Sequence, residues 1–328
     1  MIKRLMALLL LVAVFFGQAA LAESAPAAGE AGTDAAADGA FPALNEQGFL
    51  DEGEFVFQDK KNGVWRYASQ TLKVEIHRRS SAKPKMVWYE AEIWSAAGET
   101  FRMLANDEEH RMKSQDWPYK IARKHQSVFA MSSDYAQLRI AQHKRVGILV
   151  RNGEIVSERT LPKNKGVFPN LDTLALLPDG DMQVFWSDEK KAKDYVAMGA
   201  TDVLAFGPWL IRDGELNTKG LKKYGTGRAP RAAIGMVEPG HYIALMAEGR
   251  HNQSNGASIT FMAEKLKELG CTVGFNLDGG QTSTMVFMGK QIVHIGKTKG
   301  KNASARKTAE ILAIGTSDQV AGQDEKIN

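Results

Sequence analysis

Residues 148–156 read "ILVRNGEIV", in which Asn152 and Gly153 separate two short apolar runs. A two-residue hairpin turn needs positive φ at its central positions, and Asn and Gly adopt that conformation at low cost. The stretch therefore predicts two antiparallel strands joined by a tight turn. The same kind of signature recurs at Asp179-Gly180, Asp213-Gly214 and Gly289-Lys290. We expect antiparallel pairing to dominate the fold.

Apolar periodicity elsewhere predicts more strands and a minority of helices. Residues 72–76 and 87–93 alternate between apolar and polar side chains, as half-buried strands do. Residues 258–269 carry apolar side chains at helical spacing, and Gly270 follows where a helix cap is expected. Shorter helices are expected at 118–124 and within 187–200. The chain is predicted to be an α+β protein, a single domain with a mixed, largely antiparallel β-sheet and flanking helices.

The N-terminal residues have the composition of an export signal. Lys3 and Arg4 precede an apolar run, and Ala20-Leu21-Ala22 supplies a small-x-small cleavage site. We predict a signal peptide at 1–22, with an uncleaved anchor as the alternative, and an exported protein, periplasmic or extracellular. No stable membrane span is expected after cleavage. The remaining divisions are a flexible Ala/Gly-rich linker at 23–40, the folded domain at 41–318 and a polar tail at 319–328.

Composition excludes some classes of stabilisation and of partner. Cys271 is the only cysteine, so the chain has no intramolecular disulfide, and a buried structural thiol is favoured over a nucleophile. The net charge of +4 is small for 328 residues and argues against a nucleic-acid partner. The seven histidines are scattered, without the spacing of a zinc hydrolase. The sequence requires no cofactor and leaves a divalent cation open.

The stretch "FNLDGGQTSTM" at 275–285 places one carboxylate, Asp278, at the end of a predicted strand. Gly279 and Gly280 follow it, so the backbone can bend sharply and its amides can approach an anion. Thr282 and Ser283 add hydroxyl groups. Taken alone, the turn has two interpretations, because an Asp before glycines often only caps its own turn.

Arginines at the edges of apolar runs favour the chemical interpretation. Arg231 begins the run "RAAIG", and Arg250 ends "YIALMAEGR". A guanidinium group can bind phosphate through two parallel hydrogen bonds, which a lysine cannot imitate. Each arginine considered singly is about as compatible with a solvated surface position.

The order of these motifs resembles that of the phosphodiester glycosidase family. The resemblance covers about residues 63–316 and rests on "FAMSSDYAQLR", "VLAFGPWLIRDGEL", "RAPRAAIG", "YIALMAEGR" and "NLDGGQTSTM" in that order. The family pattern "NLDGGGS" is Asn276 to Thr282 in this chain, with Gln281 at the third glycine. The family pattern "NGDY" corresponds to residues 132–135, where Ser132 and Ser133 replace Asn and Gly, and Arg139 stands at the family's arginine.

The resemblance implies hydrolysis of a sugar-1-phosphodiester, like that of N-acetylglucosamine, in a glycan or glycoconjugate. It assigns the catalytic carboxylate to Asp278 and a second acid or base to Asp134. The implied substrate-binding and phosphate-binding residues are Arg231, Arg250, Arg139, Gly279, Gly280, Thr282 and Ser283.

Two other functions stay open at this stage. Ser132-Ser133 and Gln281 favour a catalytically weak or inactive relative, a glycan-binding accessory protein of exopolysaccharide or envelope assembly. A structural envelope protein is the third option, in which the arginines near Asp278 are accidental.

Overall fold

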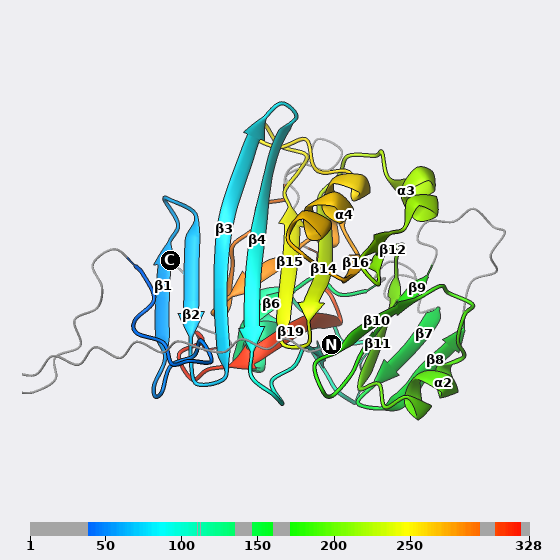
Figure 1. Cartoon of the computed structure of the whole chain (residues 1–328), viewed down its shortest axis with the longest axis horizontal. Helices are drawn as coiled ribbons and strands as arrows, with labels where there is room; N and C mark the ends of the chain where they lie inside the picture. The colour runs from blue at the N-terminus through cyan, green and yellow to red at the C-terminus, as the bar shows by residue number, and fades with distance from the viewer. Residues whose placement is uncertain are drawn as a thin grey trace, which may run out of the picture. The chain divides into compact units, whose positions relative to one another are not determined.

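The computed structural model describes residues 39–109, 111, 113–134, 146–159, 171–295 and 306–322. These residues belong to one compact unit, Ala36–Asn328 (Figure 1). The second unit, Met1–Ala35, lies outside the described residues, as do the predicted signal peptide and nearly all of the predicted linker. Tyr135 and Arg139 also fall outside them.

A nine-stranded antiparallel sheet is the largest element of the fold (Figure 1). The alternation predicted at 72–76 is confirmed, since Leu72, Val74 and Ile76 are all buried in one strand. In sheet order the strands are β1 (Phe55–Asp59), β2 (Val64–Ala68), β3 (Leu72–Ala82), β4 (Lys85–Ser95), β15 (His241–Ala247), β14 (Arg231–Glu238), β16 (Val273–Leu277), β12 (Trp209–Arg212) and β13 (Glu215–Leu216).

Two five-stranded sheets complete the β-structure. One apolar core joins all three sheets, because Tyr89, Phe206 and Phe129 belong to the same buried cluster. The second sheet has the order β10 (Met182–Phe185), β9 (Asp172–Leu176), β11 (Asp202–Phe206), β7 (Gly147–Arg151) and β8 (Glu154–Arg159). The third has the order β18 (Lys290–Gln291), β17 (Met285–Phe287), β6 (Ser127–Met131), β19 (Glu310–Thr316) and β5 (Arg102–Ala105).

The predicted hairpins are present, with one shift of a turn. Asn152 and Gly153 both have positive φ and join β7 to β8. The turn between β17 and β18 uses Met288 and Gly289, one residue earlier than predicted, because Lys290 is already in β18. All pairings between the described strands are antiparallel, so the sheets are less mixed than expected. One parallel contact, an isolated bridge, joins Gly249 to Ile295.

Helices form a minor part of the structure, so the fold is compatible with either an α+β or a mainly β description. The predicted helices are confirmed as α1 (Pro118–Lys124), α2 (Ala192–Ala197) and α4 (Ile259–Glu268). The Ser258 side chain caps α4 by accepting a hydrogen bond from the amide of Phe261. The helix α3 (Thr218–Tyr224) was not predicted, although Asn217 caps it in the same way.

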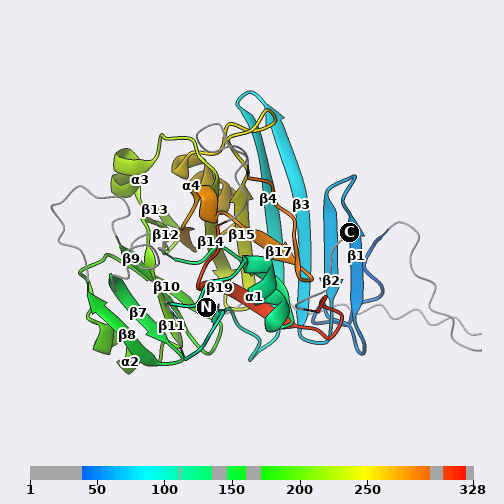
Figure 2. The same ribbon diagram turned by 180° about the vertical axis from the view of Figure 1, so that it is seen from behind.

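The helix α4 packs on the large sheet against β14, β15 and β16 (Figures 1 and 2). Its buried residues Met262 and Leu266 belong to one apolar cluster with Ala233 of β14 and Leu245 of β15. This packing holds β14, β15 and β16 in place. Within the part of the chain that the structure describes, every helix is too short or too polar to cross a bilayer.

Candidate functional site

One end of three neighbouring strands brings the predicted residues together. The strand β14 runs antiparallel to both β15 and β16, so its first residues lie beside the last residues of the other two. Arg231 is opposite Ala247, and Ala232 is opposite Leu277. Arg250 follows β15 and Asp278 follows β16 directly. The register therefore places Arg231, the Arg250 loop and Asp278 at the same end of the sheet.

The two arginines lie close enough to influence each other electrostatically. Burial lowers the pKa of Arg231, and the positive charge of Arg250 lowers it further. Nη2 of Arg231 donates to the carbonyl of Gly227 at 2.9 Å. Its Nε is buried and has no hydrogen-bond partner among the residues described. An anion bound at this point would relieve the repulsion and accept the remaining hydrogen bond.

The glycines of the turn allow it to approach both arginines. A Cβ on Gly279 would lie 2.7 Å from the carbonyl oxygen of Pro230, so only glycine fits there without a shift. The amide of Gly280 donates to that same oxygen at 2.9 Å. Gly280 has φ of +64°, and a Cβ on it would lie 3.4 Å from Nη2 of Arg250. The turn after β16 therefore packs against the start of β14 and next to the Arg250 guanidinium.

The hydroxyl groups predicted to bind substrate are buried in the same turn. The side-chain oxygens of Thr282, Ser283 and Thr284 have no hydrogen-bond partner in the described part of the chain. Leaving a buried hydroxyl unpaired typically costs about 1–3 kcal/mol. The sequence indicated all three hydroxyl groups in this turn, and Thr282 and Ser283 were the two predicted to bind substrate.

Asp278 and Asp134 are linked through the backbone. The amide of Asp278 donates to the carbonyl of Ser133 at 3.1 Å, and the Asp278 residue is half-buried. Asp134 is 4% exposed, and its Oδ2 accepts from Nη2 of Arg151 at 3.1 Å and from the amide of Ala205 at 3.3 Å. The Asp134 carboxylate is thus held in a buried ion pair.

Comparison with known families gives the arrangement a family context. The phosphodiester glycosidase profile matches residues 125–315, which include β14, β15 and the turn after β16. The chain belongs to the phosphodiester glycosidase family.

One relative matches part of this chain at low sequence identity. The SPβ prophage-derived uncharacterized protein YomE of Bacillus subtilis (strain 168) is 27% identical over 171 residues, which is 48% of this chain. The chain spans about a quarter of that relative's length, since the aligned part is 27% of it.

Two solved structures share the fold. The catalytic domain of zebrafish N-acetylglucosamine-1-phosphodiester α-N-acetylglucosaminidase, auto-inhibited by its pro-peptide, has a TM-score of 0.58 and 16% identity. It covers 81% of this chain and 88% of its own. A hypothetical protein from Synechocystis has a TM-score of 0.54 and 12% identity, covering 75% of this chain and 62% of its own. At these identities the two structures support the fold alone.

The residues that depart from the phosphodiester glycosidase pattern form hydrogen bonds at the turn. The Ser132 hydroxyl donates to the carbonyl of Thr282 at 3.0 Å and accepts from the amide of Thr284 at 2.9 Å. Oε1 of Gln281 accepts from Nη2 of Arg306 at 3.1 Å, and the Arg306 amide donates to the Gln281 carbonyl at 2.9 Å. Ser132 and Gln281 thus have hydrogen bonds that stabilise the turn, and the hydroxyl of Ser133, the third substituted position, donates to the Glu310 carbonyl at 3.2 Å.

Sequence reasoning missed a group of buried charges behind Asp134. Arg151 of β7 binds Glu310 of β19 through two hydrogen bonds, each of 2.9 Å, and Arg111 also pairs with Glu310 at 2.7 Å. Burial alone would lower the pKa of Arg151, but Glu310 and Asp134 together raise it. The only sequence signal was a charged residue next to each apolar run: Arg151 ends "ILVR", and Glu310 begins "EILAIG".

Further features of the structure are the thiol, a buried tryptophan and the distribution of possible metal ligands. Cys271 is buried, and burial raises the pKa of its thiol to about 12, which fits a structural residue. Trp209 is 9% exposed and packs edge-on against Trp186 with ring centroids 5.0 Å apart. Among the described residues, His, Cys, Asp and Glu form no group of three suited to a metal ion.

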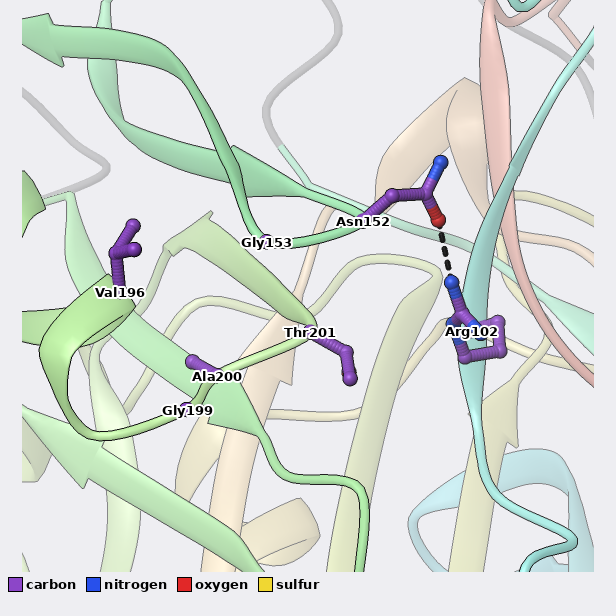
Figure 3. Close-up of a pocket in the computed structure, with 7 residues that line it drawn as sticks. All are labelled: Arg102, Asn152, Gly153, Val196, Gly199, Ala200 and Thr201. Atoms are coloured by element: carbon purple, nitrogen blue, oxygen red, sulfur yellow. Dashed lines mark hydrogen bonds between the residues drawn. The ribbon is translucent and has the colours of Figure 1, made fainter.

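A separate surface hollow of about 240 Å³ lies between the β7–β8 turn and the end of α2 (Figure 3). It is lined by Arg102, Asn152 and Thr201, among others, and Arg102 donates hydrogen bonds to Asn152 and to the buried carboxylate of Asp202. The lining contains none of the predicted substrate-binding residues. We assign the hollow no function.

Proposed function

We propose that the chain hydrolyses a sugar-1-phosphodiester of the N-acetylglucosamine-1-phosphodiester type, in a glycan or glycoconjugate. The observation that carries the proposal is the meeting of Arg231, Arg250 and the Asp278 turn at one end of the large sheet. Water supplies the oxygen that replaces phosphate at the anomeric carbon. The products are the free sugar, a phosphomonoester on the other component and a proton.

The arginines suit the leaving group of this reaction. Negative charge grows on the phosphate oxygens as the bond to the anomeric carbon breaks. Arg231 and Arg250 neutralise that charge, and a phosphate would also pair the buried Nε of Arg231. Arg139, by its position in the family motif, is proposed as a third phosphate ligand.

The turn after β16 supplies the other proposed contacts. Asp278 stabilises the positive anomeric carbon, attacks it or activates a water molecule beside it. The Gly279 amide and the hydroxyls of Thr282 and Ser283 orient the phosphate. Gly280 contributes the sharp bend alone, because its amide already donates to the Pro230 carbonyl.

Asp134 has two proposed roles. The family pattern gives it the role of a second acid or base. Its buried contacts favour positioning instead, because Oδ2 already accepts from Arg151 and from the amide of Ala205. In that role it fixes Ser133, whose carbonyl receives the amide of Asp278.

A second candidate is a glycan-binding accessory protein without turnover. Ser132, Ser133 and Gln281 favour it, since all three depart from the family pattern beside the proposed carboxylate. The hydrogen bonds of Ser132 with Thr284 and of Gln281 with Arg306 leave the turn intact in this chain, so binding could persist if catalysis were lost.

A substrate assay separates the two candidates. The purified chain is incubated with UDP-N-acetylglucosamine and with a chromogenic N-acetylglucosamine phosphodiester, and free sugar is measured. Sugar release supports the hydrolase. Saturable binding of these compounds without release supports the accessory protein.

The proposed location is outside the cytoplasm, periplasmic or extracellular. This part of the proposal rests on the signal-like sequence at 1–22. Its test is the N-terminal sequence of the protein recovered from a bacterial periplasm or medium after expression of the full chain. We expect it to start at Glu23.

A further inference from the structure

The backbone at Arg250 has an uncommon conformation. Its φ of 64° lies in the left-handed region, which a residue with a side chain rarely adopts. Such a conformation is strained and persists only when neighbouring contacts hold it. Contacts on both sides of Arg250 meet this requirement.

A buried carboxylate lies two residues before Arg250. Glu248 is 2% exposed, and its Oε1 accepts from the hydroxyl of Tyr89 at 3.0 Å and from the amide of His294 at 2.9 Å. Its Oε2 lies 3.1 Å from Nε2 of His251. Two segments distant in sequence, β4 and the residues after β18, therefore converge on one carboxylate together with the residue after Arg250.

The segment that follows Arg250 is also fixed to β4. His251 and Ser254 exchange backbone hydrogen bonds of 3.2 and 3.1 Å. The Ser254 hydroxyl donates to the Glu248 carbonyl at 2.8 Å and accepts from the amide of Val87 at 3.1 Å. Glu248 and Ser254 thus tie both flanks of Arg250 to β4.

We propose that Glu248 is a positioning residue that aims the Arg250 guanidinium at the substrate phosphate, acting through its hydrogen bonds to Tyr89 and the backbone of His294 and its close contact with the His251 ring. The inference rests on the phosphate site of the proposed function. It adds Glu248, a residue outside the turn and the arginines, as the one that fixes the geometry of that site.

The experiment is a double-mutant cycle read by calorimetric titration of inorganic phosphate. In Glu248→Gln, an amide group must face at least one of the three groups that contact the carboxylate, so the contacts around Arg250 loosen. We expect phosphate binding to weaken about tenfold, the effect typical of losing a hydrogen bond to a buried charge. Because Glu248 acts through Arg250, the double variant with Arg250→Ala should bind no more weakly than Arg250→Ala alone.

Two further variants distinguish a specific effect on phosphate binding from a general loss of folding. Tyr89→Phe removes one donor to Glu248 and should weaken phosphate binding about threefold. Glu92→Gln alters a comparable Glu–His pair, 2.8 Å from His241 on the same β4 strand, and should leave binding unchanged. Near-ultraviolet circular dichroism checks that each protein is folded.

The outcomes separate this inference from the proposed function. Effects of Glu248→Gln and Arg250→Ala that simply add, or normal phosphate binding by both folded Glu248→Gln and Tyr89→Phe, would overturn the positioning role alone. Normal phosphate binding by Arg250→Ala, or no saturable binding by the unaltered protein, would overturn the phosphate site and the inference together.

Discussion

At the residue scale, the site depends on the fork-like geometry of its arginines. Nη2 of Arg231 donates to the Gly227 carbonyl, and this hydrogen bond orients the guanidinium. Its buried Nε has no hydrogen-bond partner among the described residues. A lysine would keep the charge but would lose the second hydrogen-bond donor and the planar shape. The type of cation therefore matters as much as its charge.

Arg231→Lys tests this geometry. We expect phosphate affinity to fall about tenfold, since one charge-assisted hydrogen bond is lost. Calorimetric titration of phosphate gives the dissociation constant. Arg79→Lys, which alters an exposed pair with Glu90, is the matched control and should bind normally. Equal affinity in the Arg231→Lys and unaltered proteins would argue against a forked contact.

His251 predicts a pH dependence of stability. Burial lowers its pKa, and His294 and Arg78 lower it further, while Glu248 acts in the opposite direction. Below the usual histidine pKa, the unfolded chain therefore binds more protons than the folded chain at this residue. The contribution of His251 makes the unfolding free energy decrease as pH falls from about 7.5 to about 5.5.

Urea unfolding of His251→Gln across that range measures this contribution. The variant should lose less stability on acidification than the unaltered protein does. A variant with the same or a steeper loss would contradict a lowered pKa for His251.

At the element scale, local signals predicted most strands and the longest helix. The turn Asn152-Gly153 and the cap Ser258 act within a few residues, so the sequence carries their geometry directly. The helix α3 was missed because its seven residues, which include Gly220, lack a clear apolar period. The end of β16 next to Asp278 was predicted, since apolar alternation stops there.

Contacts between distant elements were harder to predict. The meeting of Arg231 and Arg250 follows from a hairpin, because β14 and β15 are consecutive strands. The contacts of Glu248 with Tyr89 and His294 join residues far apart in the chain, and no local pattern marks them. The positions of site residues were thus predictable where one hairpin joins them.

The turn after β16 should be sensitive to a single added methyl group. Gly279→Ala would place Cβ 2.7 Å from the Pro230 carbonyl, so the turn must move away from β14. We expect about 1–3 kcal/mol lower stability, typical of overpacking, together with lower activity. Urea unfolding and the sugar-release assay measure both. Gly322→Ala, where the added atom has no neighbour within 4 Å, is the control, and a similar result for both variants would refute the close contact.

At the scale of the whole molecule, buried charges connect two sheets behind the site. Arg151 belongs to the β7 sheet and Glu310 to the β6 sheet, while Asp134 extends the pair toward Ser133 and Asp278. Removing Glu310 leaves Arg151 with Asp134 but without its two hydrogen bonds to Glu310, so a buried charge is only partly compensated, which is more costly than having no charge there.

Glu310→Gln should therefore lower the unfolding free energy by about 3–5 kcal/mol. The exposed pair of Glu189 and Arg212 provides a comparison, because Glu189→Gln should cost less than about 1 kcal/mol. Urea denaturation of the two variants measures the difference. Similar small losses in both would show that the buried pair contributes little to joining the sheets.

The central claim is that Asp278 performs chemistry at a phosphate site formed by Arg231 and Arg250. Its most direct measurement is the turnover of a chromogenic N-acetylglucosamine phosphodiester by Asp278→Asn, alongside phosphate binding by the same folded protein. We predict that turnover falls by a factor of about 10² to 10⁴ while phosphate still binds. Full turnover by Asp278→Asn would contradict the claim.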